Sequence, residues 1–234
     1  MRETIAMDEI DLKKEQQASL ARPRYRYSMA ARFFFASMDL LSGKKTTLSK
    51  TLLIELLASI PYRAWELQMY ARTTLGYKNR EQVRKALKLM DWSRAAQDNE
   101  YWHVQAIEAK ISEDGAKRAW YLIQPVPLVA IVFYVFFTRM LALFNLRRAF
   151  LFNAEFEDHA EHVYAQFVQD HPEWETQPVE SPVVLERMPF ENWADVFRRI
   201  GLDERDHRND SFIEAGLPEH LADYEGAPEH PKLG

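Results

Sequence analysis

Apolar residues recur at helical spacing along four long parts of the chain. The four predicted helices occupy residues 48–74, 81–112, 128–169 and 189–212. Pro61 should kink or interrupt the first, because proline removes a backbone donor. The third is strongly apolar first and polar later, which predicts two helices or one bent helix. The last has Asn192 or Asp195 near its start, and Gly201 is a weak point within it.

Composition supports an all-α fold in a single domain. The chain has 234 residues, enough for one substantial core, and only 7 glycines. It lacks the alternating Val, Ile and Thr runs that predict strands. We therefore expect one helical domain over residues 29–215. Residues 1–28, polar and of mixed charge at first, predict a mobile N-terminal arm, and the proline-containing residues 216–234 predict a loose tail.

Charge and cysteine content exclude several classes of function. The net charge of −5 gives no electrostatic case for nucleic-acid binding. The chain has no cysteine, which excludes disulfides, thiolate metal sites and Cys-ligated iron–sulfur clusters. A metal would have to be held by histidine and carboxylate ligands, and this donor set suits iron or manganese.

Two Glu-x-x-His pairs lie on different predicted helices: Glu100 with His103, and Glu204 with His207. Residues three apart project from one face of a helix, so each pair can offer a carboxylate and an imidazole to one centre. Taken alone, either pair also fits an exposed polar helix face. Two such pairs, with one Glu from each of two further helices, form the ligand set of di-iron carboxylate bundles.

Glu55 and Glu157 are the candidates for the two further carboxylates. Glu55 interrupts the apolar run Leu-Leu-Ile-Glu-Leu-Leu, where an unpaired carboxylate would suffer a large desolvation penalty. The alternative is a Glu on the polar edge of an amphipathic helix. Spacing alone leaves Glu157 open to competition from its acidic neighbours Glu155, Asp158 and Glu161.

Three further polar residues are candidates for supporting roles. Tyr164 follows Glu157 by seven residues, two helical turns along the same face, and could give an electron and a proton to oxygen chemistry. The alternative is a core tyrosine with a satisfied hydroxyl. Asn99 and Asp203 each directly precede a Glu of the two pairs, and groups in such places can orient metal ligands.

Two apolar runs predict contact with a membrane surface. Residues 128–137 are unbroken in apolar character, but a spanning helix needs about 20 such residues, so this run is too short to cross. Residues 33–41 form a shorter run. Both have basic flanks, which a helix lying in the interface of an anionic bilayer requires. The alternative is a buried core helix. Interfacial helices would make the protein monotopic, with access to a lipid-soluble substrate.

Four short motifs carry a resemblance to a known family: Ile54-Glu55-Leu56 followed by Pro61, Asn99-Glu100-Tyr101-Trp102-His103, Phe156-Glu157-Asp158-His159-Ala160 followed by Tyr164, and Leu202-Asp203-Glu204-Arg205-Asp206-His207. They resemble, in order, the motifs of the alternative oxidases, membrane-bound di-iron quinol oxidases. The resemblance covers roughly residues 30–215 and selects Glu157 among its neighbours. This sequence departs from the family pattern at Leu56, at Tyr101-Trp102 and at Asp158-His159, which flank the suspected ligands.

The resemblance implies a ferritin-like di-iron four-helix bundle with additional short membrane-interface helices. Two Fe ions would be held by Glu55, Glu100, His103, Glu157, Glu204 and His207. The redox-active tyrosine would be Tyr164. The implied activity is oxidation of ubiquinol and reduction of O₂ to water without proton pumping, by a homodimer on the membrane surface.

Two other functions stay open at this point. One is a di-iron hydroxylase or desaturase that acts on a lipid or quinone precursor and uses the same six ligands. The other is a non-enzymatic membrane-surface helical protein in which the Glu-x-x-His pairs are coincidental. No transit peptide is visible, and we therefore expect the cytoplasmic face of a bacterial inner membrane.

Overall fold

The computed structural model describes residues 10–230, and no strand lies between these positions. Eight α-helices lie there: α1 (Leu12–Ala21), α2 (Met29–Ser42), α3 (Leu48–Gly76), α4 (Arg80–Glu113), α5 (Val126–Phe144), α6 (Leu146–Gln169), α7 (Pro182–Arg187) and α8 (Trp193–Glu214). Two short 3₁₀ helices lie in the connections, η2 (Trp120–Leu122) and η3 (Pro172–Glu175), and a third, η4 (Pro218–His220), follows α8. The predicted all-α class is confirmed for this part of the chain.

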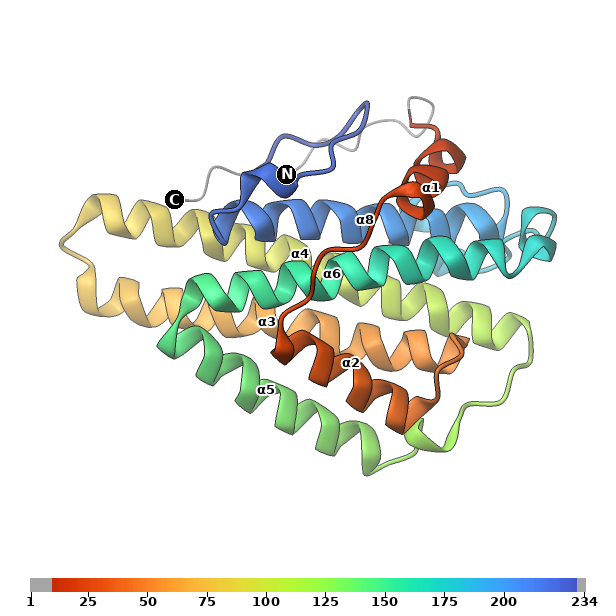
Figure 1. Cartoon of the computed structure of the whole chain (residues 1–234), viewed down its shortest axis with the longest axis horizontal. Coiled ribbons are helices and arrows are strands. Elements are labelled where there is room, and N and C mark those ends of the chain that lie inside the picture. Colours follow the sequence, from red (N-terminus) through yellow and green to blue (C-terminus); the bar gives the residue numbers. More distant parts are fainter. Residues whose placement is uncertain (1–9, 231–234) are drawn as a thin grey trace.

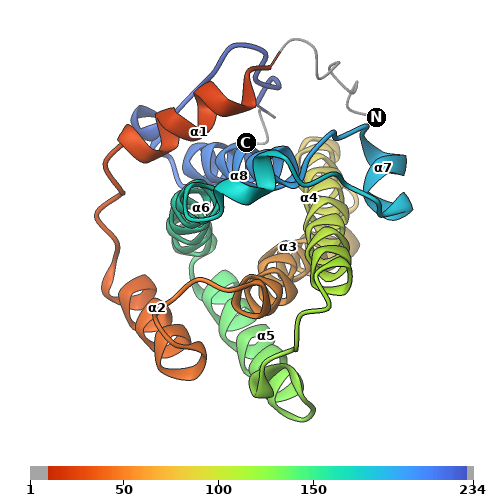
Figure 2. The same cartoon turned by 90° about the vertical axis from the view of Figure 1, so that its right-hand side faces the viewer.

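Four long helices form the body of the molecule. α3 packs along α4, and α6 packs along α8, so that two helix pairs lie side by side (Figure 1). Seen end-on, these four helices surround a common axis (Figure 2). α1 lies against α6 and α8, whereas α2 and α5 lie on the side formed by α3 and α6.

Side-chain caps fix where the long helices begin. Thr47, Asn79, Asn145 and Asn192 each precede a helix, and each side chain accepts a hydrogen bond from the backbone N–H three residues later. The cap at Asn145 divides the predicted helix 128–169 into α5 and α6, and the cap at Asn192 is one of the two predicted starts of α8. Pro61 lies inside α3 and does not interrupt it, because the helix continues to Gly76.

α5 is longer and more exposed than the ten-residue apolar run suggested. It has 19 residues, and within the described part of the chain it is the single helix long and apolar enough to cross a membrane by length and composition. The expectation that it is too short is therefore wrong. Its inner face packs against the bundle through Tyr134, Thr138 and Ala142. Its outer face exposes large apolar side chains: Leu128, Val129, Val132, Phe133, Phe136, Leu143 and Phe144.

The expected loose ends are in part packed structure. Residues 12–21 form α1, in which Glu15 and Ser19 are buried against α6 and α8. In the tail, the hydroxyl of Tyr224 donates to both carboxylate oxygens of Asp206, each at 3.1 Å. The predicted arm and tail thus pack against the bundle at α1 and at Tyr224, whereas residues 1–9 and 231–234 lie outside the described residues.

Candidate metal centre

Six side chains from four helices converge inside the bundle. They are the six predicted from the sequence: Glu55 on α3, Glu100 and His103 on α4, Glu157 on α6, and Glu204 and His207 on α8. All six are at least 95% buried. Within the described part of the chain they form two groups, in each of which the potential ligand atoms all lie within 4.8 Å of one another. The first group is Glu55, Glu100, His103 and Glu204, and the second is Glu100, Glu157, Glu204 and His207.

Glu100 and Glu204 belong to both groups, so the two groups form one adjoining pair of sites. Each of these carboxylates is followed three residues later by an imidazole on the same helix face, His103 or His207. Glu55 on α3 adds a third carboxylate to the first group, and Glu157 on α6 adds a third carboxylate to the second. This is the arrangement that two cations sharing two bridging carboxylates require.

The separations between donor atoms fit edges of a coordination shell. Nδ1 of His103 lies 3.2 Å from Oε2 of Glu55, 3.4 Å from Oε2 of Glu100 and 3.2 Å from Oε1 of Glu204. Nδ1 of His207 lies 2.8 Å from Oε1 of Glu100. Ligand atoms at about 2.1 Å from one ion and at right angles are roughly 3 Å apart. The donor set therefore fits a divalent cation in each group.

Several of these donor atoms lack any other partner. Both carboxylate oxygens of Glu100 and of Glu204, one of Glu157, and Nδ1 of His207 are buried without a hydrogen bond to any described residue. The close approach of His207 and Glu100 lacks hydrogen-bond alignment. Buried acceptors are normally satisfied, and a buried unpaired carboxylate is strongly destabilising. Cations would satisfy these atoms together.

Burial and mutual repulsion perturb the acidic groups of the site. Burial raises the pKa of Glu55 to about 8. Burial, and then the charges of Glu100 and Glu55, raise the pKa of Glu204 to about 8, and burial also raises the pKa of Glu157 well above its usual range. Burial opposes ionisation of Glu100 too, but the nearby imidazoles of His103 and His207 outweigh it and lower its pKa to about 2. The metal-free site therefore retains protons that bound cations would displace.

Asp203 and its neighbours fix the orientation of His103. Oδ2 of Asp203 lies 3.3 Å from Nε2 of His103, so the other ring nitrogen faces the candidate site. Asn99 donates to the same oxygen at 3.2 Å, and Arg199 donates to Oδ1 at 2.6 Å. A carboxylate behind a metal-binding histidine is a common device that fixes its tautomer and raises its basicity. Both residues predicted to support the site, Asn99 and Asp203, are therefore placed behind it.

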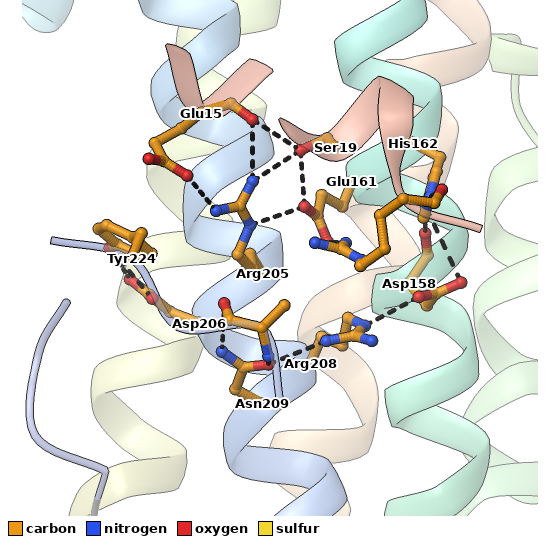
Figure 3. Close-up of polar contacts among 12 residues, drawn as sticks. Glu15, Ser19, Asp158, Glu161, His162, Arg205, Asp206, Arg208, Asn209 and Tyr224 are labelled. Atoms are coloured by element: carbon orange, nitrogen blue, oxygen red, sulfur yellow. Dashed lines mark hydrogen bonds and ion pairs between the residues drawn. The ribbon is translucent and has the colours of Figure 1, made fainter. Parts of the chain in front are cut away.

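The acidic neighbours that competed with Glu157 have partners elsewhere. Asp158 accepts from Arg208 at 2.8 Å, and Glu161 accepts from Arg205 at 2.8 Å (Figure 3). Glu155 accepts from the backbone and hydroxyl of Ser28. The first two contacts join α6 to α8, and the third fastens the N-terminal segment to α6. They leave Glu157 as the carboxylate of α6 that faces the site, as the resemblance implied.

Two tyrosines contact Glu55 and Glu157, the outer carboxylates, each of which belongs to one group only. Tyr164 donates its hydroxyl to Oε1 of Glu55. Tyr62 donates to Oε1 of Glu157 at 2.9 Å, and Asn153 donates to the same oxygen at 3.0 Å. Sequence reasoning missed Tyr62, although a signal was present. It follows Glu55 by seven residues, the same spacing by which Tyr164 follows Glu157.

No protein-family model matches the chain, and no curated protein matches it. The resemblance to the alternative oxidases therefore stays a prediction. The structure brings buried Glu and His side chains together at distances that suit metal ligands.

Proposed function

We propose that this chain is a membrane-associated di-iron oxidase of the ferritin-like bundle type, which transfers electrons from a quinol such as ubiquinol to O₂ and forms water. The observation that carries the proposal is the pair of adjoining Glu/His groups that share Glu100 and Glu204 inside a four-helix body. Four carboxylates neutralise the charge of two divalent cations, and two imidazoles complete the set. When bound, two Fe(II) ions supply electrons and open positions for reaction with O₂.

Tyr164 is the residue we assign to proton and electron supply. Its buried hydroxyl donates to Glu55, an outer carboxylate of the first group, so a proton can pass from the phenol to Oε1 of Glu55 as an electron leaves the ring. Burial raises the pKa of Tyr164 well above its usual range, which keeps the phenol protonated until that step. The bundle excludes water from this contact.

A narrow pocket beside Tyr164, of about 20 Å³, has the kind of lining that a lipid-soluble reductant needs, and α2 would have to move aside to admit a quinol. The pocket lies between α2, α3 and α6, and most of its lining is apolar: Phe34, Phe35, Met38, Ile54, Phe156 and Val163. Lys50 and Asp39 are its charged members, joined at 2.6 Å. His159 completes the polar side, and its ring stacks on Phe35 with centroids 4.1 Å apart. A quinol needs an apolar body site and a few polar groups at its hydroxyls.

The exposed apolar faces of α2 and α5 support membrane association. Met29, Phe33 and Leu40 on α2 are more than 70% exposed, and the outer face of α5 also exposes large apolar side chains. α5 also packs against α3 and α6, so we propose that it lies in one leaflet, with the bundle outside the bilayer. The homodimer and the cytoplasmic face of a bacterial inner membrane stay predictions.

Oxygen uptake tests the proposal directly. Purified protein loaded anaerobically with Fe(II) should bind two irons per chain and should consume O₂ with ubiquinol in the presence of cyanide. Two quinols should be oxidised per O₂, with no hydroxylated or desaturated organic product. Such a product would instead identify a hydroxylase or desaturase, and protein that binds no iron would overturn both.

Matched variants make the test specific. Glu157→Ala should abolish quinol oxidation because it removes an outer ligand of the second group. Glu155→Gln, two residues away on the same helix, is the control, since Glu155 contacts Ser28 instead. Full quinol oxidation by Glu157→Ala would contradict the assignment.

A further inference from the structure

Tyr62 contacts the second group of ligands as Tyr164 contacts the first. Its hydroxyl donates to Glu157, and its ring lies 5.5 Å from that of His207, centroid to centroid. Both of these residues are in the second group and absent from the first. Tyr62 is fully buried, and Asn153 also donates to the same oxygen of Glu157. The carboxylate is therefore held in place even without the phenol.

Aromatic rings connect Tyr62 with an open cleft. The ring of Trp92 lies 5.3 Å from that of Tyr62, and Trp65 contacts both, at 5.2 Å from Tyr62 and 5.7 Å from Trp92. These separations are those of rings in contact. Trp92 lines a cleft of about 540 Å³, to which His207 and Tyr224 also contribute. The pocket beside Tyr164 shares no lining residue with this cleft.

We propose that Tyr62 is a second redox-active tyrosine, and that Tyr62 and Trp92 carry single electrons from a water-soluble donor in the cleft to the candidate metal centre. This inference rests on the proposed function, which supplies the oxidising centre. Electron transfer weakens steeply with distance, and the contacting rings of Trp92 and Tyr62 give a route from the cleft to Glu157 beside the direct one through His207, which also lines the cleft. The path lets the centre be reduced when no quinol occupies the pocket beside Tyr164.

Each step balances in protons and electrons. Tyr62 gives one electron to the oxidised centre, and its phenolic proton passes to Oε1 of Glu157, the atom that accepts its hydrogen bond. Trp92 then gives one electron to the Tyr62 radical, and the proton returns from Glu157. The oxidised indole of Trp92 keeps its Nε1–H contact of 2.7 Å with Oδ2 of Asp210. One electron from a small donor such as ascorbate restores Trp92.

Radical spectroscopy separates this path from the one through Tyr164. Protein loaded with Fe(II) is mixed with O₂ without quinol, frozen rapidly and examined by electron paramagnetic resonance. The Tyr164→Phe variant should still show a tyrosyl signal, and adding Tyr62→Phe should remove it. In the Tyr164→Phe background, Trp92→Phe should slow the decay of the signal in ascorbate several-fold. Deuterated tyrosine should narrow the signal and so identify its source.

Tyr121→Phe is the matched control. Tyr121 is also a buried tyrosine, but its hydroxyl lies 3.5 Å from that of Thr47 and contacts none of the six candidate ligands. This variant should keep both radicals. Because phenylalanine preserves the ring, Tyr62→Phe should keep the helix content and the two irons per chain, both measured on the same samples.

The outcomes distinguish this inference from the proposed function. Two irons per chain and O₂ consumption, with no radical in Tyr164→Phe, would overturn the role of Tyr62 alone. A tyrosyl signal that remains in the double variant Tyr164→Phe with Tyr62→Phe would also overturn the role of Tyr62 alone. An ascorbate decay that Trp92→Phe leaves unchanged would overturn the path to the cleft. A chain that binds no iron would overturn the proposed function and this inference together.

Discussion

The carboxylate of Glu100 faces the imidazole of His207 across 2.8 Å, from Oε1 to Nδ1. Its other oxygen, Oε2, lies 3.4 Å from Nδ1 of His103, which is in the other group. One carboxylate thus presents one oxygen to each imidazole, as a bridging ligand would. Glu157 by contrast belongs to one group alone. The two kinds of carboxylate should therefore contribute differently to metal binding.

Removal of a shared carboxylate should cost more iron than removal of an outer one. We expect Glu100→Ala to bind no iron and Glu157→Ala to bind one iron per chain, because the first group stays complete in Glu157→Ala. Elemental analysis after anaerobic loading and desalting measures this, with Glu155→Gln as the control that keeps two. Equal iron contents in Glu100→Ala and Glu157→Ala would show that Glu100 is not shared.

Asp203→Asn should weaken iron binding while it leaves the fold intact. The substitution removes the charge behind His103 but keeps the shape of the side chain. Loss of such a partner lowers metal affinity by about 10- to 100-fold. Competition with a chelator of known affinity measures the change. Asp206→Asn, on the same helix and bonded to Tyr224, should alter affinity much less. Similar losses in both variants would point to a general effect of charge.

Arg205 fastens α1 to the bundle, and its removal should be strongly destabilising. It is 2% exposed and donates to Glu161, to Ser19 and to the carbonyl oxygen of Glu15 (Figure 3). Arg205→Ala leaves the buried carboxylate of Glu161 with Arg22 as its charged partner, and breaking a buried pair costs about 3–5 kcal/mol. Urea denaturation measures the change in the free energy of unfolding.

A surface ion pair provides the control for Arg205. The side chain of Arg94 is 50% exposed and pairs with Glu66 at 2.6 Å. Arg94→Ala should cost roughly 0–1 kcal/mol, because solvent screens exposed pairs. If Arg205→Ala were as mild as Arg94→Ala, the contacts of Arg205 with Glu15 and Ser19 on α1 would contribute little to stability.

The sequence predicted the long helices and the facing ligands because both depend on local spacing. His103 lies three residues after Glu100, and this alone places them on one helix face. The burial of Glu55 was predictable from its apolar neighbours. The break at Asn145 was one of two stated possibilities, and the structure decides it through a cap that the hydrophobic pattern does not show.

Contacts that depend on the register between helices could not be predicted. Tyr62 reaches Glu157, and Tyr164 reaches Glu55, only because α3 and α6 lie antiparallel with their Glu and Tyr side chains at matching heights. Seven residues along a helix span about 10.5 Å, so a shift of one turn would break both contacts. The packing of α1 was hidden for a different reason: polar residues such as Glu15 look solvent-exposed until their buried partners are known.

The metal-free protein should lose stability as pH rises from about 5 to 8. Glu55 and Glu204 have pKa values raised to about 8 by burial, against about 4.3 for an unfolded Glu, so the folded state holds more protons across this window. Burial disfavours the charged form of His103, but the carboxylates around it outweigh burial and raise its pKa, so His103 changes stability in the same direction. Burial lowers the pKa of His159 to about 4, so this one residue makes stability rise with pH between about 4 and 6.5, against the larger effect of the other groups.

Iron should reverse this dependence. Ligands bind metal in their deprotonated form, so affinity should increase with pH as Glu55 and Glu204 release their protons. Thermal unfolding at about pH 5.5 and about pH 8, with and without Fe(II) under anaerobic conditions, measures both trends. A metal-free protein that is more stable at the higher pH would contradict the raised pKa values of these two carboxyl groups.

The outer face of α5 should bind membranes. Phe133 and Phe136 are 66% and 64% exposed on this face, and burying each in a bilayer should contribute about 1.5–3 kcal/mol. Phe133→Glu with Phe136→Glu should therefore reduce binding to anionic vesicles by more than tenfold, since 1.4 kcal/mol is about a factor of ten. Co-sedimentation measures binding. Leu75→Glu, at an 87% exposed residue near the end of α3, is the control and should bind normally. Equal losses in the control and in the double variant would show that α5 is not the membrane contact.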